Sequence, residues 1–139
     1  MKQIMLGILA AISLVNISLA SAVEVQLIAK NIDDRVDIYV DGDNVATCTW
    51  NMENCQAYRK LNLTGKHKIN FKLTNYVYKG FCLFGRCGKY SGDFAIALGD
   101  GRALWSDAIY VRDNTKGVKY DKKLVCVFDE DDSYCVEER

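Results

Sequence analysis

The sequence contains no proline and only one histidine, and its formal net charge is zero. Zero net charge argues against a nucleic-acid-binding protein, because such proteins use excess positive charge to hold phosphate groups. With His67 alone, the chain lacks the side chains for most histidine-based catalytic and metal sites. A glycosidase that works through two carboxylates is the remaining catalytic alternative, but so short a chain leaves little room for a deep substrate cleft. The sequence therefore predicts a protein that is not an enzyme and that holds no cofactor or metal ion.

The chain also lacks an apolar run long enough for a transmembrane helix. Its longest run, from Ile4 to Val15, is shorter than the roughly 20 residues that such a helix needs. The run follows the basic start Met1-Lys2-Gln3 and precedes Ala20-Ser21-Ala22, a small-x-small cleavage signal. This order is typical of a secretory signal peptide, with an uncleaved anchor as the alternative. We therefore expect residues 1–22 to be removed and residues 23–139 to form one secreted or periplasmic domain without a membrane span.

Cysteine, by contrast, is plentiful, and all six cysteines follow residue 22. An even number of cysteines in a small exported domain indicates disulfide bonds. Zinc binding is the alternative, but the spacings differ from Cys-x2-Cys and no second histidine is present. The cysteines form close couples in the sequence, each around a turn-like stretch. We therefore expect the pairs Cys48–Cys55, Cys82–Cys87 and Cys126–Cys135, which would pin loops rather than join distant parts of the domain.

Apolar and polar residues alternate along most of the predicted domain. After Gly65, Ile69, Phe71 and Leu73 share one parity, while Asn70 and its neighbouring lysines share the other. This period of two is typical of a half-exposed antiparallel strand. The same period recurs at 36–40 and at 94–98, and both runs end at turn signals, Asp41-Gly42 and Gly99-Asp100-Gly101. Many short strands without a helical period predict an all-β sandwich or barrel.

Three segments resemble the galactose-binding-domain-like jelly rolls over roughly residues 23–112. They are Ile32–Gly42 (IDDRVDIYVDG), with Trp50 shortly after it, Leu61–Phe71 (LNLTGKHKINF) and Gly101–Asp107 (GRALWSD). The resemblance implies a single antiparallel β-sandwich of jelly-roll type, here clipped by disulfides. It also implies carbohydrate binding through end loops, because modules of this family often bind carbohydrate beside glycoside hydrolases.

The segment from Asn75 to Tyr90 is the richest in aromatic and basic residues. A Cys82–Cys87 bond would hold its tip, residues 83–86, as a rigid knob, and rigidity lowers the entropy lost on binding. Aromatic rings there could stack on a sugar while Arg86 and nearby carboxylates bond its hydroxyls. The knob could instead plug a partner enzyme, since aromatic and arginine residues anchor protein interfaces. A third interpretation is that Tyr76, Tyr78 and Phe81 complete the core of the sandwich.

The sequence thus predicts a secreted or periplasmic, non-catalytic binding protein whose partner is carbohydrate, bound through end loops. The alternative is a protein-binding inhibitor or immunity-type protein that blocks an enzyme. Loop capping is the alternative role for the acidic pair at 33–34, and core packing is the alternative for at least one tryptophan. The candidate ligand-binding residues are Asp34, Trp50, Tyr78, Phe84, Arg86, Tyr90, Trp105 and Asp107.

Overall fold

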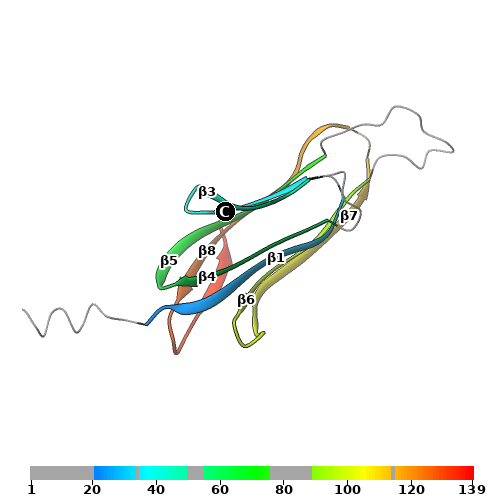
Figure 1. Ribbon diagram of the computed structural model, residues 1–139. Helices are drawn as coiled ribbons and strands as arrows, with labels where there is room; N and C mark the ends of the chain where they lie inside the picture. The colour runs from blue at the N-terminus through cyan, green and yellow to red at the C-terminus, as the bar shows by residue number, and fades with distance from the viewer. Residues whose placement is uncertain (1–20, 34, 50–54, 76–88, 114) are drawn as a thin grey trace, which may run out of the picture.

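The chain is described by a computed structural model in which residues 21–33, 35–49, 55–75, 89–113 and 115–139 are placed, Cys55 by its backbone alone. These residues form strands and turns and contain no helix (Figure 1). The strands are β1 (Val23–Asp33), β2 (Arg35–Val40), β3 (Asp43–Cys48), β4 (Cys55–Leu63), β5 (Gly65–Asn75), β6 (Lys89–Leu98), β7 (Ala103–Arg112), β8 (Gly117–Phe128) and β9 (Tyr134–Glu137).

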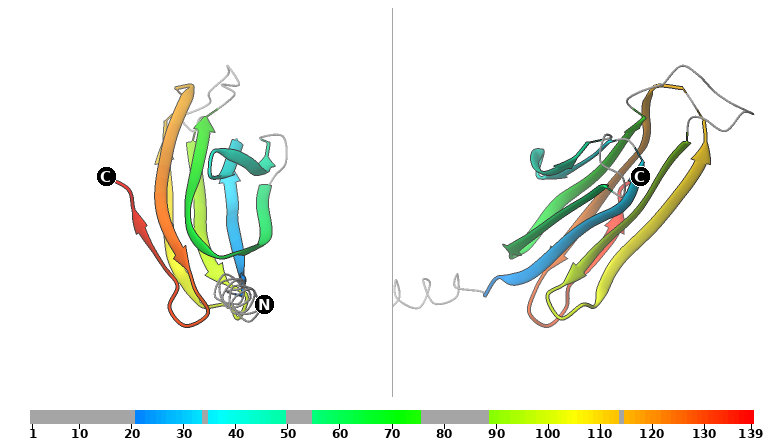
Figure 2. Two further views of the ribbon diagram at one scale, coloured as in Figure 1. Left: turned by 90° about the vertical axis from the view of Figure 1, so that its left-hand side faces the viewer. Right: turned by 45° about the vertical axis from the view of Figure 1, so that its right-hand side comes forward.

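The strands make two antiparallel sheets that pack face to face (Figures 1 and 2). One sheet has the order β4-β1-β6-β7 and the other the order β3-β2-β5-β8-β9. The hairpins β2–β3, β6–β7 and β8–β9 each stay within one sheet, and the other connections pass between sheets. The predicted all-β antiparallel sandwich is therefore confirmed. The jelly-roll topology stays a prediction.

The alternation along β5 explains why this segment is a central strand. Ile69, Phe71 and Leu73 are fully buried, whereas Lys66 and Lys68 on the opposite parity are exposed. Successive residues of a strand point to opposite faces, so one face of β5 fills the core and the other meets solvent. On β2, Val36, Ile38 and Val40 are likewise all buried on the core face, and Asp37 on the other face is buried as well.

Aromatic rings from both sheets meet in the core. Phe71 of β5 packs edge-on against Phe94 of β6, with ring centroids 5.5 Å apart, and stacks against Trp105 of β7 at 5.4 Å. Phe94 in turn stacks on Tyr120 of β8 at 4.5 Å. Since β6 and β7 belong to one sheet and β5 and β8 to the other, these rings join the two layers. Such pairs add about 0.5–1.5 kcal/mol each beyond the burial of their area.

One of the predicted disulfides is confirmed directly. Cys126 of β8 is bonded to Cys135 of β9, and the two are cross-strand neighbours. Cys48 is also disulfide-bonded. Its pairing with Cys55, and the bond between residues 82 and 87, stay predictions, because the side chain of Cys55 and all of residues 76–88 lie outside the described part of the chain. Within the described ranges, no helix is long and apolar enough to cross a membrane.

Asp113, at the end of β7, organises the approach to β8. Its carboxylate accepts hydrogen bonds from the backbone N–H of Thr115 (2.9 Å) and the Thr115 hydroxyl (2.7 Å), and it pairs with Lys119 at 3.1 Å. These bonds, led by the Thr115 N–H, lower the pKa of Asp113 to about 2. Asn75, at the end of β5, donates to the carbonyl oxygens of Asp113 and Thr115, so three strands meet at this point.

The lowered pKa of Asp113 leads to a prediction about the stability of the fold at low pH. A carboxyl group with a depressed folded-state pKa stabilises the fold above its unfolded-state pKa, and this contribution is lost as the pH falls through the folded value. We expect Asp113→Asn to be less stable than the wild type at neutral pH, with the difference shrinking between about pH 4 and pH 2. Urea denaturation at several pH values measures the difference. A difference that stays constant down to pH 2 would contradict the assignment.

Candidate functional site

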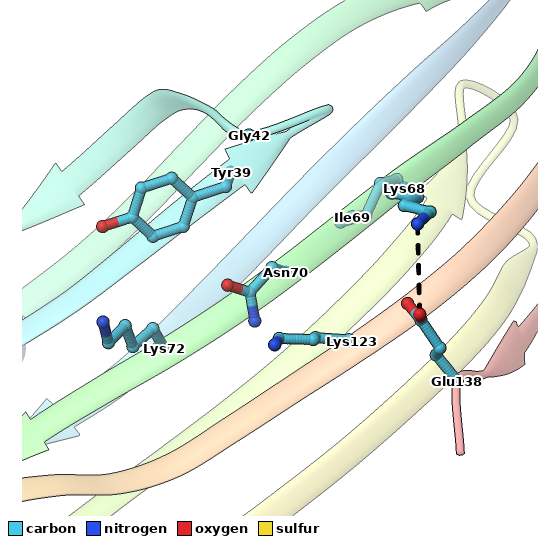
Figure 3. Close-up of a pocket in the computed structure, with 8 residues that line it drawn as sticks. All are labelled: Tyr39, Gly42, Lys68, Ile69, Asn70, Lys72, Lys123 and Glu138. Atoms are coloured by element: carbon cyan, nitrogen blue, oxygen red, sulfur yellow. Dashed lines mark ion pairs between the residues drawn. The ribbon is translucent and has the colours of Figure 1, made fainter.

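An open pocket of about 470 Å³ lies on the outer face of the five-stranded sheet (Figure 3). We call it the sheet pocket. Its lining comes from β2 and the turn after it, from β5, from β8 and from the residue after β9. The residues are Tyr39, Gly42, Lys68, Ile69, Asn70, Lys72, Lys123 and Glu138.

Strand register explains why these side chains gather. Tyr39, Asn70 and Lys123 occupy one row across β2, β5 and β8, since Asn70 pairs with Tyr39 on one side and with Lys123 on the other. Lys68 and Lys72 precede and follow Asn70 by two residues on the same face of β5. Neighbouring strands are about 4.8 Å apart, so the row spans about 10 Å. The pocket is thus built from the face of β5 that does not enter the core.

Asn70 is held in one orientation. Its Nδ2 donates to Asp121 Oδ1 at 2.6 Å and to the carbonyl oxygen of Lys122 at 3.0 Å. Because both partners are acceptors, the amide nitrogen must face them, and the amide oxygen faces the other way. Figure 3 shows this oxygen on the side of Tyr39 and the nitrogen on the side of Lys123. The sheet pocket therefore presents a fixed hydrogen-bond acceptor beside an aromatic ring.

Asp41 and His67 position the β2–β3 turn beside β5. Asp41 adopts a positive φ of 51° and is followed by Gly42 at 87°, which is the left-handed region that this tight turn requires. Asp41 N–H donates to the Lys68 carbonyl at 2.8 Å, and Lys68 N–H donates to Asp41 Oδ1 at 2.9 Å. His67 Nδ1 lies 2.6 Å from Asp41 Oδ2. The His67 and Lys68 hydrogen bonds lower the pKa of Asp41.

The histidine is thereby a structural residue. Its Nε2 faces the carbonyl oxygen of Thr64 at 3.0 Å, so both ring nitrogens of His67 have acceptors as neighbours. Its side chain is only 22% exposed. His67 thus has a partly buried position near the start of β5. His67 therefore has a role in holding the turn and leaves no ring nitrogen for acid–base chemistry.

Another carboxylate, Asp37, is buried and fully engaged. It is 5% exposed and lies on β2. It accepts from Arg35 Nε at 3.0 Å, from the Thr47 hydroxyl at 2.6 Å and from Asn44 Nδ2 at 3.2 Å. These donors replace the water that the carboxylate loses on burial. Asp37 thereby links β2 to β3 beside the sheet pocket.

Trp105 and Asp107, which the sequence suggested as ligand contacts, lie on β7, the edge strand of the four-stranded sheet. The Trp105 ring stacks on Phe71, and its Nε1 donates to Glu137 Oε1 at 3.2 Å. Asp107 accepts from the Tyr120 hydroxyl at 2.7 Å and from the N–H of Ala108 at 2.9 Å. Burial, followed by the bond to Asp107, raises the pKa of Tyr120. The structure brings these residues together, but away from the sheet pocket.

The other predicted ligand residues divide into two groups. Tyr90, on β6, is only 9% exposed and belongs to the core. The remaining ones lie outside the described residues, so the predicted end-loop site is not tested. They are Asp34, Trp50, Tyr78, Phe84 and Arg86.

The sequence indicates the β5 residues of the sheet pocket, Lys68, Asn70 and Lys72, only as the solvent side of a strand. The row of lysines around Asn70 was the available signal, because it lies outward on a long strand whose other face is core. The missing information was register. Tyr39 and Lys123 are far from Asn70 in sequence, and only strand pairing brings them beside it.

Comparisons with protein-family models, curated proteins and solved structures give no match to this chain. The resemblance to galactose-binding-domain-like jelly rolls therefore stays a prediction from the segments quoted above. Across the described residues, no group of three or more His, Cys, Asp or Glu side chains could hold a metal ion.

Proposed function

We propose that this chain is an exported, non-catalytic carbohydrate-binding protein and that the sheet pocket holds the sugar. The observation that carries the proposal is the placement of the Tyr39 ring beside the oriented amide of Asn70. The apolar face of a sugar ring packs well on an aromatic ring, and its hydroxyl groups donate to fixed acceptors such as Asn70 Oδ1. Figure 3 shows both side chains on the open side of the sheet.

Binding rather than catalysis is supported by the state of the nearby carboxylates. Glu138 pairs with Lys68 at 4.0 Å, and Asp121 accepts from Asn70. Both carboxylates are thus engaged with a neighbouring side chain, whereas glycoside hydrolysis uses two carboxyl groups that face the scissile bond. Export is supported by the signal-like residues 1–22 and by the Cys126–Cys135 bond, since disulfides persist in oxidising compartments.

Tyr39→Ala tests the proposal. We expect it to weaken binding of the best glycan found on an array by about tenfold, because the stacking surface is lost. Tyr39→Phe keeps the ring and should retain most of the affinity. Tyr110→Ala is the matched control, since Tyr110 is 60% exposed on β7 of the other sheet. Titration calorimetry measures the affinities. Equal losses in Tyr39→Ala and Tyr110→Ala, or none in either, would contradict the assignment of the pocket.

The protein-binding alternative has a distinct outcome in the same experiments. Tyr58 and Tyr110 are 51% and 60% exposed on the four-stranded sheet, and tyrosine is a common interface anchor. A one-to-one complex with a protein, unaffected by Tyr39→Ala and accompanied by no glycan binding, would favour an inhibitor or immunity-type role over carbohydrate binding.

A further inference from the structure

We infer that the carbohydrate bound in the sheet pocket is acidic, bearing carboxylate or sulfate groups. This inference rests on the proposed function and names its substrate class. It comes from the charges that surround Asn70, which the alternation of β5 and its register with β8 place together.

Three ammonium groups surround the amide. Lys68 and Lys72 flank Asn70 along β5, and Lys123 is its cross-strand neighbour on β8. Figure 3 shows the Lys123 side chain beside Asn70, and Lys72 on the same side of the pocket as the Tyr39 hydroxyl. An anionic group held between these lysines would therefore meet donors on more than one side, while a hydroxyl group of the same sugar donates to Asn70 Oδ1. Ammonium groups bind carboxylate and sulfate oxygens through charge-assisted hydrogen bonds.

These lysines are not neutralised by the carboxylates around them. Glu138 is the one acidic residue of the lining, and its 4.0 Å contact with Lys68 joins two exposed side chains, which is a weak pair. Lys72 and Lys123 make no ion pair with any described residue.

Asp37 and Asp121 are the cross-strand neighbours of Lys72. Asp37 is paired with Arg35, whereas Asp121 accepts from the Asn70 amide, which is neutral and does not offset its charge. The lining has three positive charges against one negative charge, and one positive charge remains in excess when Asp121 beside it is counted. The full chain has a net charge of zero, so this excess is a local property of the pocket.

The test compares acidic and neutral polysaccharides. Polygalacturonate supplies carboxylates and dextran sulfate supplies sulfates, whereas unmodified dextran supplies neither. The variants are Lys72→Gln, Lys123→Gln and the two combined. Lys30→Gln is the matched control, because Lys30 is an exposed lysine on β1 of the other sheet. Affinity is measured by calorimetry at low and at high salt, and urea denaturation verifies that each variant is folded.

We expect at least one acidic polysaccharide to bind more tightly than dextran. Each single variant should weaken that binding by about three- to tenfold, and the double variant by about thirtyfold or more, with Lys30→Gln unchanged. High salt should weaken the wild type more than the double variant, because the Debye length falls to about 3 Å at 1 M salt. Which of the two acidic polymers binds identifies the anionic group.

Other outcomes would overturn the inference in distinguishable ways. Dextran bound as tightly as the acidic polymers, with no effect of the lysine variants, would reject the acidic ligand and leave carbohydrate binding intact. Polyglutamate or phosphatidylglycerol vesicles bound as tightly as the acidic polysaccharides would indicate a general polyanion surface instead. Failure to bind any polysaccharide would reject both the inference and the proposed function.

Discussion

Replacing Phe71 by alanine is expected to lower the free energy of unfolding by about 3–5 kcal/mol, as large aromatic-to-alanine changes in cores do. Phe71 is fully buried on the central strand β5. Its ring contacts Phe94 and Trp105 on the opposite sheet, so its removal opens a cavity between the layers. Domains are stable by about 5–15 kcal/mol in total. Urea denaturation should therefore show a large fall in the transition midpoint.

Phe71→Leu is the matched variant. Leucine refills most of the volume and should cost about 1–2 kcal/mol. Phe71 also lies between Asn70 and Lys72, which face the sheet pocket, so the alanine variant is expected to weaken ligand binding as well. The leucine variant should bind normally. A loss below about 1 kcal/mol in Phe71→Ala would mean that the two layers do not pack through this ring.

The fold class could be predicted because one face of each central strand is uninterrupted core. The alternation of Ile69, Phe71 and Leu73 with polar residues has no other stable solution than a half-exposed strand. The Cys126–Cys135 pair was likewise predictable, because two cysteines on either side of a short acidic tip, Asp129–Asp132, fit a hairpin. That tip is exposed, as a hairpin end must be.

Strand order and register could not be predicted. Pairing of β1 with β6 and of β5 with β8 joins residues far apart in the chain, and no local pattern specifies those partners. The sheet pocket depends on this pairing. Its row of Tyr39, Asn70 and Lys123 could therefore not be predicted from the sequence. Each of these residues is unremarkable alone, and only their juxtaposition suggests a ligand.

The same reason explains the placement of Asp107. In the sequence it ends the GRALWSD segment that resembles the jelly-roll family, and it was a candidate ligand contact. Its partners are the Tyr120 hydroxyl, from another strand, and the N–H of Ala108. An inward carboxylate near an edge strand also discourages pairing with other chains. Asp107 therefore has a structural explanation that only the packing of β7 near β8 reveals.

Removing the disulfide by the double change Cys126→Ala and Cys135→Ala is expected to destabilise the protein by about 3 kcal/mol. Closing a loop of this length restricts the unfolded chain by about 2–3 kcal/mol, since the two cysteines are separated by 9 positions. Cys126 is also fully buried, so its truncation leaves a small cavity. The matched control is Val125→Ala with Val136→Ala, the adjacent cross-strand pair on the outer face, which should cost much less.

The double cysteine variant should also release β9 locally. That strand has only four residues, and beyond its ladder it is attached through Glu137, which accepts from Trp105, and Glu138, whose N–H donates to the Lys123 carbonyl. Hydrogen exchange at Glu138 should accelerate well before global unfolding. Because Glu138 is the one carboxylate lining the sheet pocket, its departure should leave binding of an acidic polysaccharide unchanged or stronger. Weaker binding in this variant, with exchange at Glu138 unaltered, would mean that β9 is held independently of the disulfide and that the pocket needs its carboxylate.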